Sequence, residues 1–222
     1  MESFFNILPS SANIYIYAPT ILPSSLEYYD CPQCGMLQLP RLKENPVKMI
    51  AQGKGKYPDF MLCGHHPYTL LSQKAVNILE SEANAQMDLL PVELYDPKGN
   101  SRAEEHDGYY IMRPKTVLEM DYQRMGLEVV SDCPECGVMK FDKQPKDFGK
   151  LILDYPEDKP LPDLFRLKHN KYMIFCTKKL LEIIYRNSLK NINASMGRDA
   201  YIYGVEDLNL KEMFKKPRKK KE

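Results

Sequence analysis

The chain has 222 residues, of which 43% are hydrophobic and 27% charged, as is ordinary for a water-soluble globular protein. No apolar run approaches the ~20 residues that cross a bilayer, and residues 1–11 lack the basic region and long apolar core of a secretory signal, so we expect a cytoplasmic protein without a membrane partner. The net charge is +1, but residues 215–222 carry +5 and the rest of the chain −4, which argues against a large nucleic-acid-binding face.

Short strands and one helix are predicted in the first part of the chain. β-Branched, aromatic or apolar residues predict strands at 13–18 and 59–63. Residues 41–58 mix Lys, Gly and Pro and predict a loop, with at most a helical turn at 47–51. Apolar residues recur at helical spacing from 68 to 80, and Ser72 can cap this amphipathic helix.

An antiparallel run of strands is predicted in the middle of the chain. The strands are expected at 89–95, 109–113, 116–121 and 127–130. Polar stretches at 96–101 and 104–108 predict turns between the first of them. The last strand leads directly into a Cys-Pro-Glu-Cys-Gly motif.

The third part of the chain follows a stiff polar connection at 156–162. A buried strand at 172–176, with Cys176 in the core, precedes a helix that Thr177 caps and that runs to about 187. A last strand at 201–205 and a short helix at 208–214 are also expected. The predicted fold is α+β, a mainly antiparallel sheet with two to three helices. We predict one globular domain over 1–214, in which 155–163 could divide subdomains, and a basic disordered tail over 215–222.

Two near-identical motifs carry most of the chemistry, Cys31-Pro-Gln-Cys34-Gly and Cys133-Pro-Glu-Cys136-Gly. Each Cys-Pro-x-Cys-Gly turn, here called a knuckle, directs two thiolates to one point, and its glycine permits the positive φ of a tight turn. Two knuckles supply the four thiolates of a tetrahedral zinc site. We therefore predict that Cys31, Cys34, Cys133 and Cys136 share one Zn²⁺. Beyond the knuckles, we detect no internal repeat.

Two other uses of the cysteine pairs compete with zinc. A redox dithiol also has the C-x-x-C spacing, but its first cysteine begins a helix, whereas the residues after Cys34 and Cys136 alternate as in a strand. A pair of disulfides needs an oxidising compartment, for which the sequence carries no address.

The spacing of the knuckles predicts what a shared metal would do. Residues 35–132 separate Cys34 from Cys133, far more than the roughly 15–20 residues of a compact zinc ribbon. The zinc would thus close most of a domain, and four protein ligands leave no position for substrate. By analogy with a cross-link closing a loop of this length, it would stabilise the fold by about 4–5 kcal/mol. The expected zinc is therefore structural and joins distant segments.

No catalytic motif is recognisable, so we expect that the protein is not an enzyme. The sequence contains no phosphate-binding glycine loop, zinc-protease motif or serine-hydrolase motif. His65 and His66 follow Cys63 before the predicted helix. We interpret this stretch as a turn with one buried thiol, which is simpler than a second metal site. The acidic groups at 104–107 and 157–158 are interpreted as solvated loop charges.

Two Cys-Pro-x-Cys-Gly motifs about a hundred residues apart resemble the bacterial double-CXXCG motif family. Two further stretches fit the resemblance. His66-Pro-Tyr-Thr-Leu-Leu-Ser-Gln-Lys-Ala lies where that family has a Pro-x-x-Leu-Leu segment opening a helix, and Asp163-Leu-Phe-Arg-Leu is similar to its Asp-Leu-Phe-Arg segment. The resemblance covers roughly residues 25–195. It implies an immunity protein that binds and neutralises a cognate protein toxin without catalysis.

The partner surface is less defined by the sequence. The acidic body favours a basic partner, and the loops 96–108 and 155–163 are candidates because they combine acids with Tyr109, Tyr110 or Tyr155. The alternative function is a zinc-stabilised nucleic-acid-binding or transcription-associated module, which would use Lys48, Lys54, Lys56 and the tail. A thiol redox enzyme is a third class.

Overall fold

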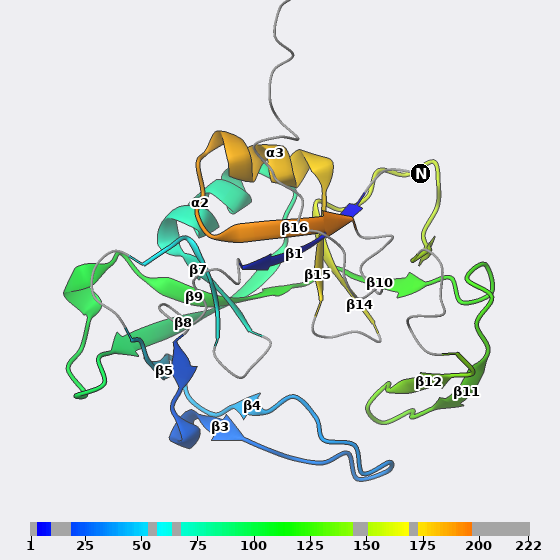
Figure 1. Cartoon of the computed structure of the whole chain (residues 1–222), viewed down its shortest axis with the longest axis horizontal. Helices are drawn as coiled ribbons and strands as arrows, with labels where there is room; N and C mark the ends of the chain where they lie inside the picture. The colour runs from blue at the N-terminus through cyan, green and yellow to red at the C-terminus, as the bar shows by residue number, and fades with distance from the viewer. Residues whose placement is uncertain are drawn as a thin grey trace, which may run out of the picture.

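Two six-stranded sheets and two α-helices make up most of the structure, a computed structural model that describes residues 4–9, 19–52, 57–63, 68–143, 151–168 and 173–196 (Figure 1). This agrees with the predicted α+β, mainly antiparallel class. Neither helix in these ranges is long and apolar enough to cross a membrane. The strand predicted at 13–18, the elements predicted at 201–214, the tail and His65 and His66 lie outside the described residues.

The first sheet has the strand order β13-β10-β14-β15-β1-β16. Every neighbouring pair is antiparallel except β10 and β14, which are parallel. The segment 155–163, a candidate subdomain boundary, connects β13 to β14, and both of these strands pair with β10. The strands are β1 (Phe4–Pro9), β10 (Val117–Met120), β13 (Leu153–Asp154), β14 (Leu164–Leu167), β15 (Ile174–Thr177) and β16 (Ile192–Met196).

The second sheet has the strand order β2-β5-β8-β9-β7-β6, and only β5 and β8 are parallel. The prediction of a loop with at most a helical turn at 47–51 is wrong, because Val47–Ile50 forms β5. Val47 and Met49 are buried and alternate with less buried neighbours, which is the period of a strand. The strands are β2 (Thr20–Ile21), β5 (Val47–Ile50), β6 (Phe60–Leu62), β7 (Thr69–Ser72), β8 (Met87–Tyr95) and β9 (Tyr109–Pro114).

Two small hairpins carry the knuckles. In the first, β3 (Leu26–Glu27) pairs with β4 (Arg41–Leu42), and in the second, β11 (Val129–Asp132) pairs with β12 (Met139–Phe141). We call residues 26–42 the first arm and residues 127–142 the second arm. Figure 1 shows the first arm reaching below the body toward the second arm. Short 3₁₀ turns lie at Pro23–Ser25 and Ala103–Glu105.

Both helices begin at the predicted capping residues. α2 (Gln73–Glu82) is capped by Ser72, whose Oγ accepts the backbone N–H of Ala75 at 3.1 Å, and α3 (Lys178–Arg186) is capped by Thr177. The helices lie side by side over the sheets (Figure 1). They bury one shared core that includes Phe60, Leu71, Leu79, Leu164, Cys176, Leu180 and Ile184.

The structure also contains a repeat beyond the knuckles, which the sequence analysis missed. An aspartate opens a two-stranded hairpin and a helix twice, as Asp59-β6-β7-α2 and as Asp163-β14-β15-α3. In both copies the cap residue bonds back to this aspartate: the hydroxyls of Ser72 and Thr177 donate to its carboxylate at 2.9 and 2.8 Å. The sheet orders β6-β7-β9-β8 and β14-β15-β1-β16 match as well.

The two copies hold each other through these aspartates. Asp59 accepts the backbone N–H of Lys190, which follows α3, at 2.8 Å, and Asp163 accepts the backbone N–H of Asn84, which follows α2, at 2.9 Å. Each carboxylate therefore binds the capping hydroxyl of the helix in its own copy. It also accepts a backbone N–H from the segment that follows the helix of the other copy. The protein is built from two similar halves with reciprocal contacts.

Candidate metal centre

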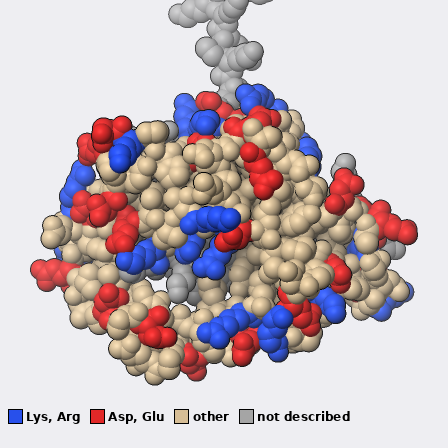
Figure 2. Space-filling view, turned by 180° about the vertical axis from the view of Figure 1, so that it is seen from behind, with Lys and Arg blue, Asp and Glu red and all other residues tan. Residues whose placement is uncertain are grey.

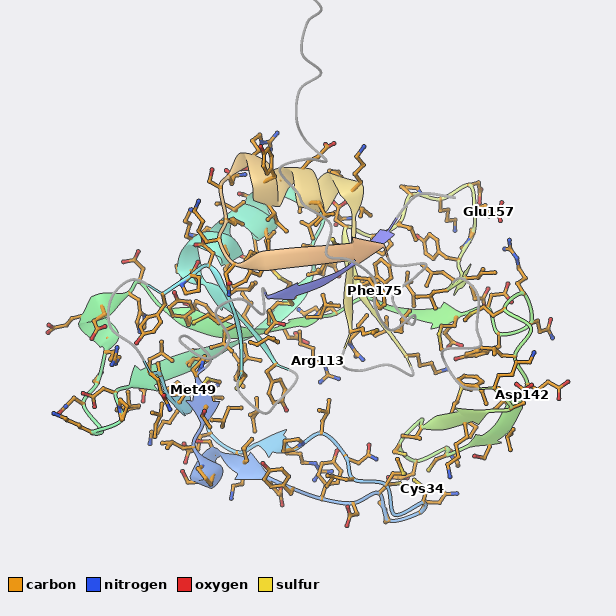
Figure 3. All side chains as sticks on the ribbon, in the orientation of Figure 1. Cys34, Met49, Arg113, Asp142, Glu157 and Phe175 are labelled. Atoms are coloured by element: carbon orange, nitrogen blue, oxygen red, sulfur yellow. The ribbon has the colours of Figure 1, made fainter. Side chains whose placement is uncertain are left out.

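The four knuckle cysteines, 102 residues apart in sequence, converge at one point where the two arms meet. Their sulfur atoms all lie within 4.8 Å of one another. Across the arms, Sγ of Cys31 lies 3.7 Å from Sγ of Cys133, and Sγ of Cys34 lies 3.6 Å from Sγ of Cys136. Figure 3 labels Cys34 at the tip of the first arm. The structure thus brings together all four residues predicted from the motif.

The knuckles have the same backbone geometry. In the first, the N–H of Gly35 donates to the carbonyl of Cys31 at 2.9 Å, and in the second, the N–H of Gly137 donates to that of Cys133 at 2.7 Å. Both glycines have the expected positive φ, 67° and 69°. Because the same turn occurs twice, each arm presents its two sulfurs in the same way.

Neither knuckle opens a helix. The first is followed by an isolated β-bridge between Asp30 and Leu37, and the second by strand β12. A helix N-terminus is what lowers the pKa of the reactive cysteine in dithiol oxidoreductases. All six cysteines of the chain are free thiols. The geometry therefore favours metal binding over the redox and disulfide interpretations.

The sulfur spacing fits a tetrahedral ion. Four thiolates at about 2.3 Å from a central zinc are separated from one another by about 3.8 Å. The two distances across the arms, 3.7 and 3.6 Å, are close to this value. With four sulfurs as ligands, a tetrahedral ion has no free position, which is the arrangement of a structural site.

Neighbouring groups shift the pKa values of three of these thiols. The N–H of Cys34 is the main cause that lowers the pKa of Cys31 to about 7, against the opposing effect of lost hydration. For Cys34 the N–H of Met36 lowers the pKa, but lost hydration and the neighbouring sulfurs outweigh it and raise the pKa to about 12. The pKa of Cys136 is also raised. Metal ligation requires thiolates, so binding of a divalent metal would release protons from Cys34 and Cys136, whose pKa values are raised.

The remaining cysteines lie apart from this cluster. Cys63 and Cys176 are fully buried in two different hydrophobic cores, as predicted for Cys176. Burial raises the pKa of the Cys63 thiol to about 12, and burial also raises the pKa of Cys176. Both are therefore inert core residues.

Exposed apolar side chains concentrate on the two arms, which sequence reasoning missed. We call this group, Tyr28, Met36, Leu37, Val129 and Val130, the arm surface; Leu37 is 63% exposed and Val130 67%. The same arms contain six acidic and two basic residues. Apolar pairs bracketed by acidic residues, at 27–30 and 128–132, are the signal that could have revealed this surface.

The interface loops proposed from the sequence present less apolar surface. Tyr109 is 3% exposed and donates its hydroxyl to the carbonyl of Pro58, and Tyr110 donates to Gln73. Tyr109 is buried and Tyr110 partly buried, so these two tyrosines offer little exposed aromatic surface, and the loops 96–108 and 155–163 stay a prediction. Lys54, Lys56 and the basic tail, on which the nucleic-acid alternative depends, lie outside the described residues.

Comparison with known proteins adds no assignment. No protein-family model matches the chain, and no curated protein matches it.

Proposed function

We propose that the cluster binds one structural Zn²⁺ and that the protein is an immunity protein that binds and neutralises a cognate protein toxin. One observation carries the proposal: two distant arms meet at four sulfurs and expose apolar side chains beside them. A protein that acts only by binding needs a rigid surface, and a metal that ties both arms supplies one. The resemblance to the double-CXXCG immunity proteins motivates the choice of a toxin as partner.

The zinc would stabilise the fold by closing a long loop of the chain. The sulfur pairs join residues 102 positions apart, and a closure of this length removes unfolded-state entropy equivalent to about 4–5 kcal/mol. The arms are hairpins with short strands and small cores of their own, so the metal would contribute most of their order. Zinc analysis of the purified protein should give one ion per chain, and a content well below one would refute this part.

The arm surface is the proposed contact with the toxin. Exposed Leu37 and Val130 can insert into pockets of a partner, and the surrounding acids, among them Glu27, Asp132 and Glu135, favour a basic protein. A toxin that acts on nucleic acid has such a basic surface. Its active site would be blocked by the arms without any chemistry in this chain.

The test uses the product of the neighbouring reading frame as the candidate toxin. Cells that express this toxin should survive when the full-length chain is co-expressed, and the two purified proteins should form a complex. Leu37→Asp and Val130→Asp should abolish protection, whereas Val117→Asp should not, because Val117 is exposed on β10 outside the arms. Zinc content and far-UV circular dichroism establish that each variant is folded.

Two results would contradict the proposal. Full protection by a Leu37→Asp, Val130→Asp double variant would remove the arm surface from the interface. Absence of any complex or protection, combined with salt-sensitive DNA or RNA binding at near-physiological salt, would favour the nucleic-acid-binding alternative.

A further inference from the structure

A pocket of about 620 Å³ lies between the first arm and the second sheet, separate from the cysteine cluster. Its walls are the arm residues Gln38–Leu42 on one side and strands β8 and β9 on the other, with Arg166 from the first sheet. Figure 2 shows a gap between the body and the arm, with Lys and Arg on both of its sides. The volume falls in the range of small-molecule sites.

The pocket is strongly cationic. Arg41, Arg113 and Arg166 line it, against one carboxylate, Asp88, which forms an ion pair with Lys115 at 3.4 Å. In the described part of the chain, none of the three arginines has a carboxylate within ion-pairing distance. Figure 3 shows Arg113 pointing into the space between the sheet and the arm. Three guanidinium groups in one pocket, none with a carboxylate partner among the described residues, form a typical anion site.

Two of the arginines are held in place by uncharged groups. The guanidinium of Arg41 lies 4.2 Å from the ring centroid of Tyr29, and Nε of Arg166 donates to the carbonyl of Pro114 at 3.2 Å. Burial and the nearby charge of Arg113 lower the pKa of Arg166, against the opposing effect of the Asp88 carboxylate. The repulsion between Arg113 and Arg166 destabilises the pocket, and a bound anion would offset this destabilisation.

Most of the remaining lining residues are apolar, with Gln38, Asp88 and two tyrosines as the polar ones. Ile111, Met112 and Ile174 are buried beside the arginines, and Leu89 and Leu42 are partly buried. A purely inorganic anion would leave this wall in contact with water. A ligand with an apolar or aromatic body and one anionic group would cover both parts of the pocket.

We propose that this pocket binds a small organic anion, a carboxylate or phosphate on an apolar body, and that the arm forming its wall is fixed by the metal cluster. The arm is held at two places: the hydroxyl of Tyr68 donates to the carbonyl of Pro40 at 2.7 Å, and the tip ends at Cys31 and Cys34. Metal occupancy thereby controls ligand affinity. The toxin partner has no part in this proposal; only the control of affinity rests on metal binding.

Calorimetric titration of the full-length, metal-loaded protein tests the pocket with three probes. Phenyl phosphate should bind more tightly than inorganic phosphate, and benzyl alcohol, which lacks the charge, should not bind. In Arg113→Gln and Arg166→Gln the affinity for phenyl phosphate should fall at least about tenfold. Arg124→Gln is the matched control, because Arg124 is paired with Glu157 away from the pocket and its loss should leave the affinity unchanged.

Equal phenyl phosphate affinity in the wild type and both pocket variants would overturn the pocket. Chelation of the metal should weaken binding, and so should Cys136→Ser, which removes a metal ligand from the second arm and no residue that lines the pocket. Unchanged affinity in both cases would overturn the role of the arm. The Cys136→Ser variant remains decisive if the chelated protein unfolds, and none of these measurements depends on whether a toxin is bound.

Discussion

Asp163, one of the two reciprocal aspartates, should contribute strongly to the free energy of unfolding. Its side chain is 6% exposed and accepts three hydrogen bonds, from the N–H of Asn84 at 2.9 Å, from Oγ1 of Thr177 at 2.8 Å and from Nζ of Lys179 at 2.8 Å. Asp163→Ala leaves the hydroxyl of Thr177 without an acceptor in a buried site and the N–H of Asn84 without one in a partly buried site. At about 1–3 kcal/mol for each such donor, the expected loss is about 3 kcal/mol.

The lysine contributes little to this total. The side chain of Lys179 is 59% exposed, so it regains hydration when the carboxylate is removed. Lys179→Met is therefore the matched control, with an expected loss of less than about 1 kcal/mol. Urea unfolding followed by far-UV circular dichroism measures both variants. A loss in Asp163→Ala no larger than that in Lys179→Met would refute the reasoning.

The same contacts predict a pH dependence. Burial raises the pKa of Asp163, but the hydrogen bonds from Lys179, Asn84 and Thr177 outweigh it, and the net pKa is lowered. A carboxyl with a lowered folded-state pKa contributes stability that is complete above the ordinary value of about 3.9 and is lost as the pH falls through the folded value. Asp163→Asn should remove this acid-sensitive part. If the free energies of unfolding of the wild type and of Asp163→Asn fall in parallel below pH 5, the acid sensitivity does not come from Asp163.

Three further predictions concern the cluster, a helix cap and the core. Cobalt(II) substitution should give the charge-transfer bands of four thiolates, which Cys34→Ser should weaken and Cys63→Ser should not; equal spectra for wild type and Cys34→Ser would exclude the fourth ligand. Ser72→Ala should lower the free energy of unfolding by about 1 kcal/mol through loss of the α2 cap, and a change below experimental error in urea titration would show the cap to be dispensable. The rings of Phe165 and Phe175 are stacked with their centroids 5.6 Å apart, and both side chains are fully buried. Phe175→Ala should therefore lower the free energy of unfolding by about 3–5 kcal/mol. A loss below about 1 kcal/mol in urea titration would mean that this core is not packed as described.

Local chemistry explains which elements could be predicted from the sequence. The capping residues Ser72 and Thr177 each precede apolar residues at helical spacing, and both helices begin at these residues. Cysteine pairs with proline and glycine at fixed positions specify the knuckle turns without help from the rest of the fold. In these cases the information lies within about ten residues of sequence.

The errors arise where the partner of a segment is distant. Val47–Ile50 has only four residues in which to show alternation, and it becomes a strand because β8, some forty residues later, pairs with it in parallel. The same holds for β7 (Thr69–Ser72), which the prediction assigned to the start of a longer helix. Such short strands form because neighbouring strands pair with them, and their own few residues do not predict them.

The repeat was missed because few residues recur in it. Pro58-Asp59 matches Pro162-Asp163, and Ser72-Gln-Lys74 matches Thr177-Lys-Lys179, while the apolar residues between them differ. The retained residues are those with a bonding role: the aspartate accepts, the hydroxyl donates and the lysine pairs with the carboxylate. A search for recurring hydrogen-bonding residues, not for overall similarity, would have found it.

The two sets of repeated residues act at different places in the molecule. The aspartates fasten each half to the chain after the other half's helix, while the cysteines join the arms that extend from the opposite end of the body (Figure 1). Each half supplies two of the four sulfurs and one of the two carboxylates, so neither half can complete the cluster or satisfy its helix end alone. The arginine pocket lies between these two closures, and its wall is the arm whose tip carries Cys31 and Cys34. Loss of the metal should therefore change the arm and the pocket first, while the core held by the aspartates and the helices is retained.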